Sequence, residues 1–305
     1  MGTVSPQAKS LAGRAVPLAN LSRMQNAGAD NRIEIHSKDN KTVKLAASLA
    51  EKKHRDALGA YLIEGPNLVR EALQQGVKIQ FIFTGAGALS QQQEIEEILR
   101  LAEFSDSAVC VLSEDCFAKI ATSSTPQPIM AVAEKRTWQI RDVFSPGGNV
   151  LVLDRIQDPG NLGTLLRTAE ATGFSGALLI KGGADPYGPK AVRAGAGCVF
   201  RFPLLLCSSP ADALALLTEQ RKTVWTADME GTPCFEADLA QNVAVVIGNE
   251  GNGADALFKE NNGRVTVPMA GKTESLNAGI AAAILMYESM RQRRTQDVRY
   301  DTATL

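Results

Sequence analysis

Short apolar runs alternate with amphipathic stretches along most of the chain. Such runs are typical of buried strands, whereas apolar positions spaced three and four apart are typical of helices. In the first half the pattern predicts an amphipathic helix at 38–57. Its expected inward-facing residues are Val43, Leu45, Ala46, Leu49 and Ala50. Further elements are predicted as strands at 61–63, 79–83, 108–112 and 129–133, and as helices at 66–73, 92–102 and 114–120. This alternation indicates a small three-layer α/β domain.

The second half repeats the alternation of predicted strands and helices. Strands are predicted at 150–153, 177–180, 201–206, 223–226, 243–247 and 265–267, and helices at 160–173, 209–220, 253–260 and 275–293. Strands that are apolar on both faces and joined by helices predict a parallel sheet. We therefore expect an α/β protein with a smaller N-terminal domain at 31–140 and a C-terminal parallel-sheet domain at 150–295.

The segments outside these two domains have the composition of tails and a linker. Pro146-Gly147-Gly148 indicates a linker at 141–149. Residues 1–30 and 296–305 are expected to be tails. Residues 1–29 contain no acid and include Arg14 and Arg23, which also fits a transit peptide, but a disordered tail is the favoured interpretation.

Composition narrows the class of protein. The 305 residues allow two domains with cores of their own. A net charge of −1 excludes a globally basic nucleic-acid binder, so any RNA contact requires local patches. The five cysteines form no Cys-x-x-Cys pair, and only two histidines accompany them; we therefore expect reduced cysteines in a cytosolic protein and no metal site. No apolar run has the length of a membrane span.

Three polar or glycine-rich segments directly follow predicted strands. They are 161–169 (Asn-Leu-Gly-Thr-Leu-Leu-Arg-Thr-Ala), 247–253 (Ile-Gly-Asn-Glu-Gly-Asn-Gly) and 267–277 (Val-Pro-Met-Ala-Gly-Lys-Thr-Glu-Ser-Leu-Asn). Strand ends are where α/β proteins bind ligands, and glycines there let a ligand approach the backbone. Gly271-Lys272-Thr273 is not a P-loop, because Thr266 stands where that motif requires glycine. The spacing of Gly248 to Gly253 also differs from the dinucleotide-binding fingerprint.

This ordered trio, within residues 150–290, resembles the three motifs of the SpoU (TrmH-like) family of the SPOUT superfamily, which are RNA ribose 2′-O-methyltransferases. The resemblance implies a deep C-terminal trefoil knot, S-adenosyl-L-methionine as methyl donor and a cytoplasmic homodimer. It implies rRNA or tRNA as substrate, with rRNA slightly favoured. Tyr61-Leu62-Ile63-Glu64-Gly65 resembles part of the RNA substrate-binding domain, related to ribosomal protein L30e, that is often fused to this family.

The resemblance also implies roles for individual residues. The catalytic residues would be Asn161, Arg167, Glu250 and Asn277. The cofactor-binding residues would be Ala227, Gly231, Ile247, Gly248, Gly251, Met269, Ser275, Leu276 and Asn277. Arg167 would act either as a general base or as a clamp on a phosphate and the developing alkoxide; the second role suits a guanidinium, which is almost always protonated. Taken alone, Asn161 and Arg167 also fit a helix start and a solvated charge.

Two groups of cations are candidates for RNA contact, although each also fits an ordinary solvated helix surface. They are Lys190 and Arg193 in the C-terminal domain, and Lys41, Lys44, Lys52, Lys53 and Arg55 in the N-terminal domain. Gly195 and Gly279 stand where many family members have serine. The glycine at 279 weakens any mechanism that needs a serine hydroxyl there.

Two other functions are compatible with parts of this pattern. A catalytically silent RNA-binding protein could keep the same fold, but the complete set of expected catalytic residues argues against it. A small-molecule methyltransferase is also possible, but an N-terminal domain with a basic face argues for RNA.

Overall fold

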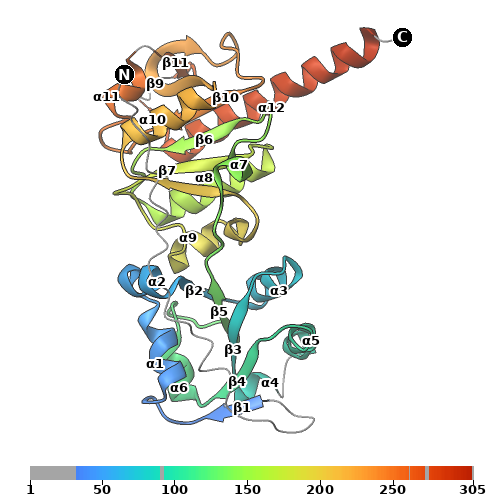
Figure 1. Cartoon of the computed structure of the whole chain (residues 1–305). Coiled ribbons are helices and arrows are strands. Elements are labelled where there is room, and N and C mark those ends of the chain that lie inside the picture. Colours follow the sequence, from blue (N-terminus) through green and yellow to red (C-terminus); the bar gives the residue numbers. More distant parts are fainter. Residues whose placement is uncertain (1–31, 90–92, 261, 272–274, 304–305) are drawn as a thin grey trace, which may run out of the picture. The chain divides into compact units, whose positions relative to one another are not determined.

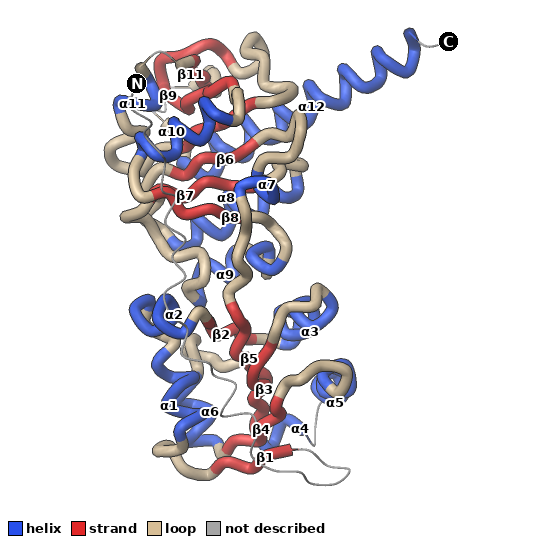
Figure 2. Tube along the Cα trace, in the orientation of Figure 1, coloured by secondary structure: helices blue, strands red, loops and turns tan. Residues whose placement is uncertain are grey.

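The computed structural model describes residues 32–89, 93–260, 262–271 and 275–303. The described residues divide into an N-terminal unit (32–69 and 78–135) and a C-terminal unit (70–77 and 136–303). Both have α/β architecture (Figures 1 and 2). No helix in the described ranges is long and apolar enough to cross a membrane. The expected N-terminal tail lies outside the described residues.

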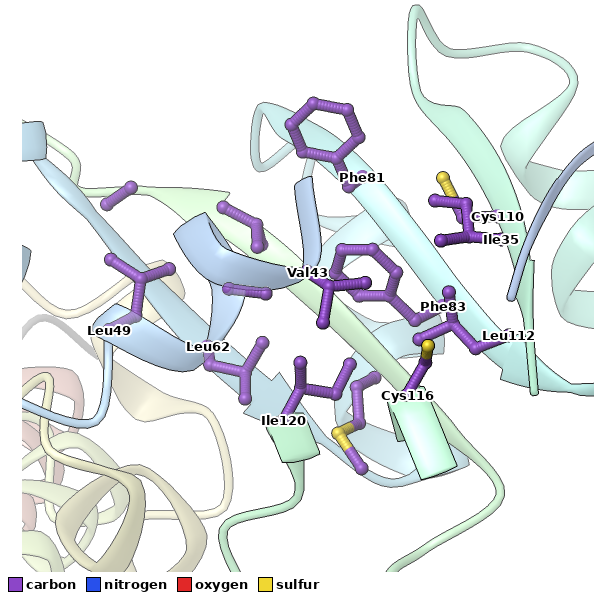
Figure 3. Close-up of a cluster of buried hydrophobic side chains, with 14 residues drawn as sticks. Ile35, Val43, Leu49, Leu62, Phe81, Phe83, Cys110, Leu112, Cys116 and Ile120 are labelled. Carbon is purple, nitrogen blue, oxygen red and sulfur yellow. The ribbon is translucent and has the colours of Figure 1, made fainter. Parts of the chain in front are cut away.

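The N-terminal unit is built on a five-stranded sheet of order β1-β4-β3-β5-β2. Strands β1, β4 and β3 are parallel, and β5 is antiparallel to both of its neighbours. The elements along residues 32–135 are β1 (Arg32–Ile35), α1 (Lys41–Ser48), α2 (Lys52–Leu58), β2 (Ala60–Glu64), α3 (Pro66–Gln74), β3 (Ile79–Gly85), α4 (Ala86–Leu89), α5 (Gln93–Ala102), β4 (Ala108–Leu112), α6 (Glu114–Ile120) and β5 (Ile129–Glu134). Helix α3 spans the boundary between the units, because residues from 70 onward are assigned to the C-terminal unit. Helices α1 and α6 cover one face of this sheet, where Val43, Phe83 and Ile120 belong to one buried cluster (Figure 3).

The predicted helix at 38–57 is wrong in one respect, because the chain forms two helices there. The amide of Glu51 bonds to the carbonyl of Ser48, a tight i to i−3 bond that closes α1. Ala50 is exposed rather than inward-facing. The prediction also missed β1, a short edge strand. It missed the single turn α4 as well, and the remaining strands and helices of this unit lie within a few residues of their predicted positions.

The C-terminal unit contains a fully parallel six-stranded sheet of order β11-β9-β10-β6-β7-β8. Its elements are α7 (Ile140–Val143), β6 (Val150–Leu153), α8 (Pro159–Ala171), β7 (Gly176–Ile180), α9 (Pro189–Ala194), a 3₁₀ turn (Cys198–Phe200), β8 (Leu204–Cys207), α10 (Pro210–Glu219), β9 (Thr223–Pro233), β10 (Val243–Ile247), α11 (Ala256–Lys259), β11 (Gly263–Thr266) and α12 (Ala278–Ala303). The predicted parallel sheet is confirmed.

Helices lie on both faces of this sheet. Side chains of α7, α10 and α11 share one apolar cluster with β6, β7 and β10, whereas α8 and α12 pack against each other on the other face. Because the strands are parallel, the loops that follow β6, β9 and β10 meet at one edge (Figure 2). That edge is where the sequence motifs lie.

Several elements in this unit differ from the prediction. The strand expected at 223–226 continues to Pro233, and the helical turn α7 lies partly in the expected linker at 141–149. The strand expected at 201–206 begins only at Leu204, after the 3₁₀ turn and Pro203. The helix expected at 253–260 is the single turn α11. Helix α12 continues to Ala303, so residues 296–303, which were expected to be a tail, are helical.

Candidate active site

A cavity of about 630 Å³ opens at the edge of the C-terminal sheet, beside the start of α12. Eight of the nine expected cofactor-binding residues border it, and they are Ala227, Ile247, Gly248, Gly251, Met269, Ser275, Leu276 and Asn277. Its volume lies within the range of about 300–1,000 Å³ that is usual for small-molecule sites. Lys272, Thr273 and Glu274 of the third motif lie outside the described residues.

Gly231, the ninth of these residues, does not border the cavity. It lies in the outer part of β9, where the pairing with β11 changes register. A Cβ at this position would lie 2.7 Å from the carbonyl carbon of Arg264. The absence of a side chain at Gly231 therefore serves the close approach of two strands.

The cavity loop, defined here as residues 248–254, is held in a tight conformation. A Cβ on Gly248 would lie 2.0 Å from the amide nitrogen of Ala254, so no other residue fits there without displacing the loop. Asn249 and Gly253 exchange two backbone hydrogen bonds of 3.1 and 2.9 Å. The Oδ1 atom of Asn249 also accepts from the amide of Gly251 at 2.9 Å. The shape of the cavity loop therefore depends on the residue types at Gly248 and Asn249.

The first and second motifs meet through a side-chain hydrogen bond. Asn161 Nδ2 donates to Glu250 Oε1 at 3.0 Å, and the amide of Gln157 donates to Glu250 Oε2 at 3.2 Å. Partial burial acts to raise the pKa of Glu250, but the hydrogen bond from Asn161 and those from nearby amides outweigh it and lower the pKa below its usual value. Glu250 is therefore a carboxylate at neutral pH, which suits it to orient the amide of Asn161.

The third motif brings Asn277 to the same place. Asn277 borders the cavity, and its Oδ1 accepts from the amide of Gly279 at 2.9 Å at the start of α12. A Cβ on Gly279 would lie 3.1 Å from Asn277 Oδ1 and 3.7 Å from Asn161 Oδ1. Gly279 therefore stands beside both asparagines, and the structure brings Asn161, Glu250 and Asn277 together.

Arg167 is not joined to these three residues. It lies six residues after Asn161 on α8, or about 9 Å along the helix axis. The side chain is exposed and forms no hydrogen bond or ion pair within the described ranges. Its guanidinium is therefore available to an anion that reaches this side of α8.

Lys190 lies next to the first motif because α9 packs closely on α8. A Cβ on Gly163 would lie 2.3 Å from the carbonyl oxygen of Ala191, so the glycine permits this contact. Lys190 Nζ reaches Asp158 Oδ1 at 2.7 Å, and Asp158 also caps α8 by accepting from the amide of Asn161. Lys190 is thus placed beside Asn161. Arg193, on the same short helix, is exposed.

The basic face expected on the N-terminal unit is smaller than the sequence indicated. Arg55 is buried and donates to the carbonyl oxygens of Leu49 and Ala50 at 2.7 and 2.8 Å, so it neutralises the C-terminal end of α1 instead of facing solvent. The expectation that Arg55 lies on this face is wrong, because the break between α1 and α2 rotates it inward.

The four lysines of this face are exposed, but they differ in their partners. Lys44 pairs with Asp39 at 2.7 Å, and Lys52 pairs with Asp56 at 2.5 Å. Lys41 and Lys53 form no ion pair with the residues that the structure describes. Two of the five expected cations therefore remain free of local acids.

The sequence did not reveal an ion pair in the cavity wall. Asp228 and Lys259 both border the cavity and approach to 2.9 Å. Burial acts to raise the pKa of Asp228, but the hydrogen bond and charge of Lys259 outweigh it and lower the pKa. An acid two residues after the strand predicted at 223–226 was the available signal for Asp228. No comparable signal pointed to Lys259.

Family-level comparisons match both halves of the chain. A model described as the SpoU rRNA Methylase family matches residues 148–287. A second model, described as the MRM3-like substrate binding domain, matches residues 40–131. The two matches include every residue of the candidate site and the helices α1 and α2.

Individual proteins resemble the chain over most of its length. It is 34% identical to the 23S rRNA (guanosine(2553)-2′-O)-methyltransferase of Bacillus subtilis, over 83% of this chain and 98% of that protein. The crystal structure of an AdoMet-bound rRNA methyltransferase from Sinorhizobium meliloti matches with a TM-score of 0.76 and 30% identity, over 86% of this chain and 98% of the other. The SpoU methyltransferase AviRb of Streptomyces viridochromogenes, in complex with AdoMet, matches with a TM-score of 0.77 and 25% identity, over 84% and 98%.

Proposed function

The chain belongs to the SpoU rRNA methylase family, and we propose that it transfers a methyl group from S-adenosyl-L-methionine to a ribose 2′-hydroxyl of ribosomal RNA. One observation carries the proposal. The second and third family motifs line a cavity of suitable size, and Asn161 of the first motif is hydrogen-bonded to Glu250 in the cavity wall. Neighbours of the same fold, named as rRNA or SpoU methyltransferases, were crystallised with AdoMet.

The cavity suits this cofactor in its chemistry as well as its size. Apolar side chains such as Met269, Leu276 and Leu285 line it and offer contacts to an adenine ring and a methionine chain. The backbone at Gly248 and Gly251, which borders the cavity, and the charges of Asp228 and Lys259 offer hydrogen bonds to ribose and amino-acid groups. When bound there, S-adenosylmethionine supplies an electrophilic methyl group.

The residues around the cavity would position the acceptor ribose. Because Glu250 holds the Asn161 amide nitrogen, the Asn161 oxygen is free to accept a hydrogen bond from a ribose hydroxyl. We assign Arg167 the role of binding a phosphate and stabilising the alkoxide that develops at the 2′-oxygen, since a guanidinium stays protonated. The cations Lys190 and Arg193 flank this place and would contact neighbouring phosphates.

Three further properties belong to the same proposal. The strand order, in which β10 lies between β9 and β6, supports a trefoil knot in the C-terminal unit. The match to a substrate-binding domain supports RNA binding by the N-terminal unit. The five cysteines are all free and buried, which supports a reducing, cytoplasmic location.

We also propose that the protein is a homodimer that associates through α12. Ile280, Ile284 and Tyr287 follow one another at helical spacing and are 55%, 38% and 61% exposed. Such a stripe on a helix is typical of a buried interface. Light scattering should report a dimer for the wild type and a monomer for Ile284→Glu, whereas a monomeric wild type would contradict this assignment.

The function itself is tested with purified protein, ribosomal RNA and S-adenosylmethionine labelled in the methyl group. Label should enter the RNA as one 2′-O-methylated nucleotide that is unmodified in RNA from cells lacking the gene. A protein that binds RNA and the cofactor but transfers no methyl group would instead be the catalytically silent form. Transfer of label to small molecules alone would exclude RNA as the substrate.

A further inference from the structure

Arg155 occupies an unusual backbone conformation next to the cavity loop. It is the second residue after β6 and has a φ of 57°, in the left-handed region where a Cβ meets steric resistance and glycine is favoured. The residue does not itself border the cavity. A residue with a large side chain adopts this strained conformation only where its contacts with the surrounding structure stabilise it.

The guanidinium of Arg155 joins two carboxylates. Its Nε donates to Asp154 Oδ1 at 2.8 Å, and its Nη2 donates to Asp255 Oδ2 at 3.0 Å. Asp154 is fully buried and also accepts from the amide of Asp255 at 2.7 Å. A buried carboxylate requires such compensation, so Arg155 and Asp154 together hold Asp255, which directly follows the cavity loop.

The backbone of Arg155 holds the other end of the same loop. Its carbonyl oxygen accepts from Asn249 Nδ2 at 3.0 Å, and Asn249 in turn accepts from the amide of Gly251. One residue therefore contacts both ends of residues 249–255, between which Glu250 lies. The left-handed φ lets the carbonyl and the side chain of Arg155 reach the two ends together.

From this geometry we infer that Arg155 is a positioning residue, which sets the shape of the cavity loop and thereby the cofactor affinity and the placement of Glu250. The inference rests on the proposed function. It assigns to Arg155 an effect on a ligand that it does not touch.

Arg155→Gly is the direct test, because glycine accepts the backbone conformation and keeps the carbonyl while the guanidinium is lost. The affinity for S-adenosylhomocysteine, the demethylated form of the cofactor, should fall roughly tenfold when measured by calorimetry. This is the size of effect seen when a residue that orients a metal ligand, without itself binding the metal, is replaced. Arg221→Gly is the matched control. Arg221 is an exposed arginine with φ 52° just before β9, at the opposite edge of the sheet, and its substitution should leave affinity unchanged.

Asp255→Asn is the second variant, in case Arg155→Gly does not fold. Asparagine keeps the oxygen that caps α11 but loses the charge that pairs with Arg155, so affinity should fall a few fold with little change in unfolding temperature. If folded Arg155→Gly binds S-adenosylhomocysteine with wild-type affinity, the inference is overturned, even if the unfolding temperature drops. If Arg155→Gly does not fold, wild-type affinity in Asp255→Asn overturns it in the same way. Failure of the wild type to bind S-adenosylhomocysteine would contradict the proposed function instead.

Discussion

The cavity loop and the basic helices α1 and α2 were both singled out by sequence, yet they are built in opposite ways. At the cavity loop, polar groups bond to residues far away in the chain, as Glu250 does with Asn161 and Asn249 with Arg155. On the basic helices, the lysines that pair do so with acids a few residues away, as Lys44 does with Asp39.

This difference determines what a substitution can do in each region. Hydrogen bonds between segments far apart in the chain fix the relative positions of several elements, so one change should disturb the whole site. Local ion pairs on an exposed helix contribute little to stability and are screened by salt. We therefore expect large, position-specific effects at the cavity and small, salt-dependent ones on the basic helices.

Among the substitutions near the cavity, Arg167→Ala should have the largest effect, and that effect should be on the rate of methyl transfer. Without a cation at the developing alkoxide, the rate of methyl transfer should fall on the order of 10²–10³-fold. Affinity for S-adenosylhomocysteine should stay within a few fold, because Arg167 does not border the cavity. Single-turnover transfer and calorimetry measure the two quantities. Arg167→Lys should also be poorly active, since an ammonium lacks the planar fork; full activity in either variant would exclude the assigned role.

Gly248→Ala should have the next largest effect, on cofactor binding. The added Cβ would meet the Ala254 nitrogen at 2.0 Å, and overpacking costs about 1–3 kcal/mol. Since about 1.4 kcal/mol corresponds to a factor of ten, affinity should fall roughly tenfold. Gly271→Ala is the control, because a Cβ there meets no described atom within 4 Å. Equal affinity of both variants would show that the cavity loop is not tightly built.

The lysines of the basic helices provide a test with a smaller expected effect. Lys41 and Lys53 have no ion pair among the described residues, so their joint replacement by alanine should weaken binding of an rRNA fragment a few fold. It should also reduce the slope of log affinity against log salt by about 2. Joint replacement of Lys44 and Lys52 should have less effect, because Asp39 and Asp56 compete with phosphates. If neither double variant changes the salt slope, the helices are an ordinary solvated surface.

The smallest expected effect is the pH dependence of stability that comes from Glu250. Its pKa is lowered in the folded protein, so its contribution is complete above the unfolded pKa of about 4.3 and is lost as pH falls through the lower folded value. The stability difference between the wild type and Glu250→Gln should therefore be constant from pH 8 to pH 5 and shrink only at more acidic pH. Urea unfolding at several pH values measures it. A difference that shrinks already near pH 6 would mean that the pKa of Glu250 is raised.

Sequence periodicity alone was sufficient for the parallel sheet and for most strands of both units. A strand such as Val243–Ile247 is apolar at every position because both of its faces are covered, and a short apolar run of this kind is typical of a buried parallel strand. The family resemblance of the motifs identified eight residues that border the cavity, whereas Gly231, assigned on the same grounds, does not border it.

Features that depend on contacts between residues far apart in the chain became visible only in the tertiary structure. The break that buries Arg55, the ion pair between Asp228 and Lys259, and the link from Arg155 to both ends of the cavity loop have no periodic signature in the sequence. Each depends on the direction of a long side chain and on the energetic requirement that a buried charge find a partner. Motifs in the sequence therefore identify the segments that form the site, whereas tertiary contacts establish which charged groups hold those segments in place.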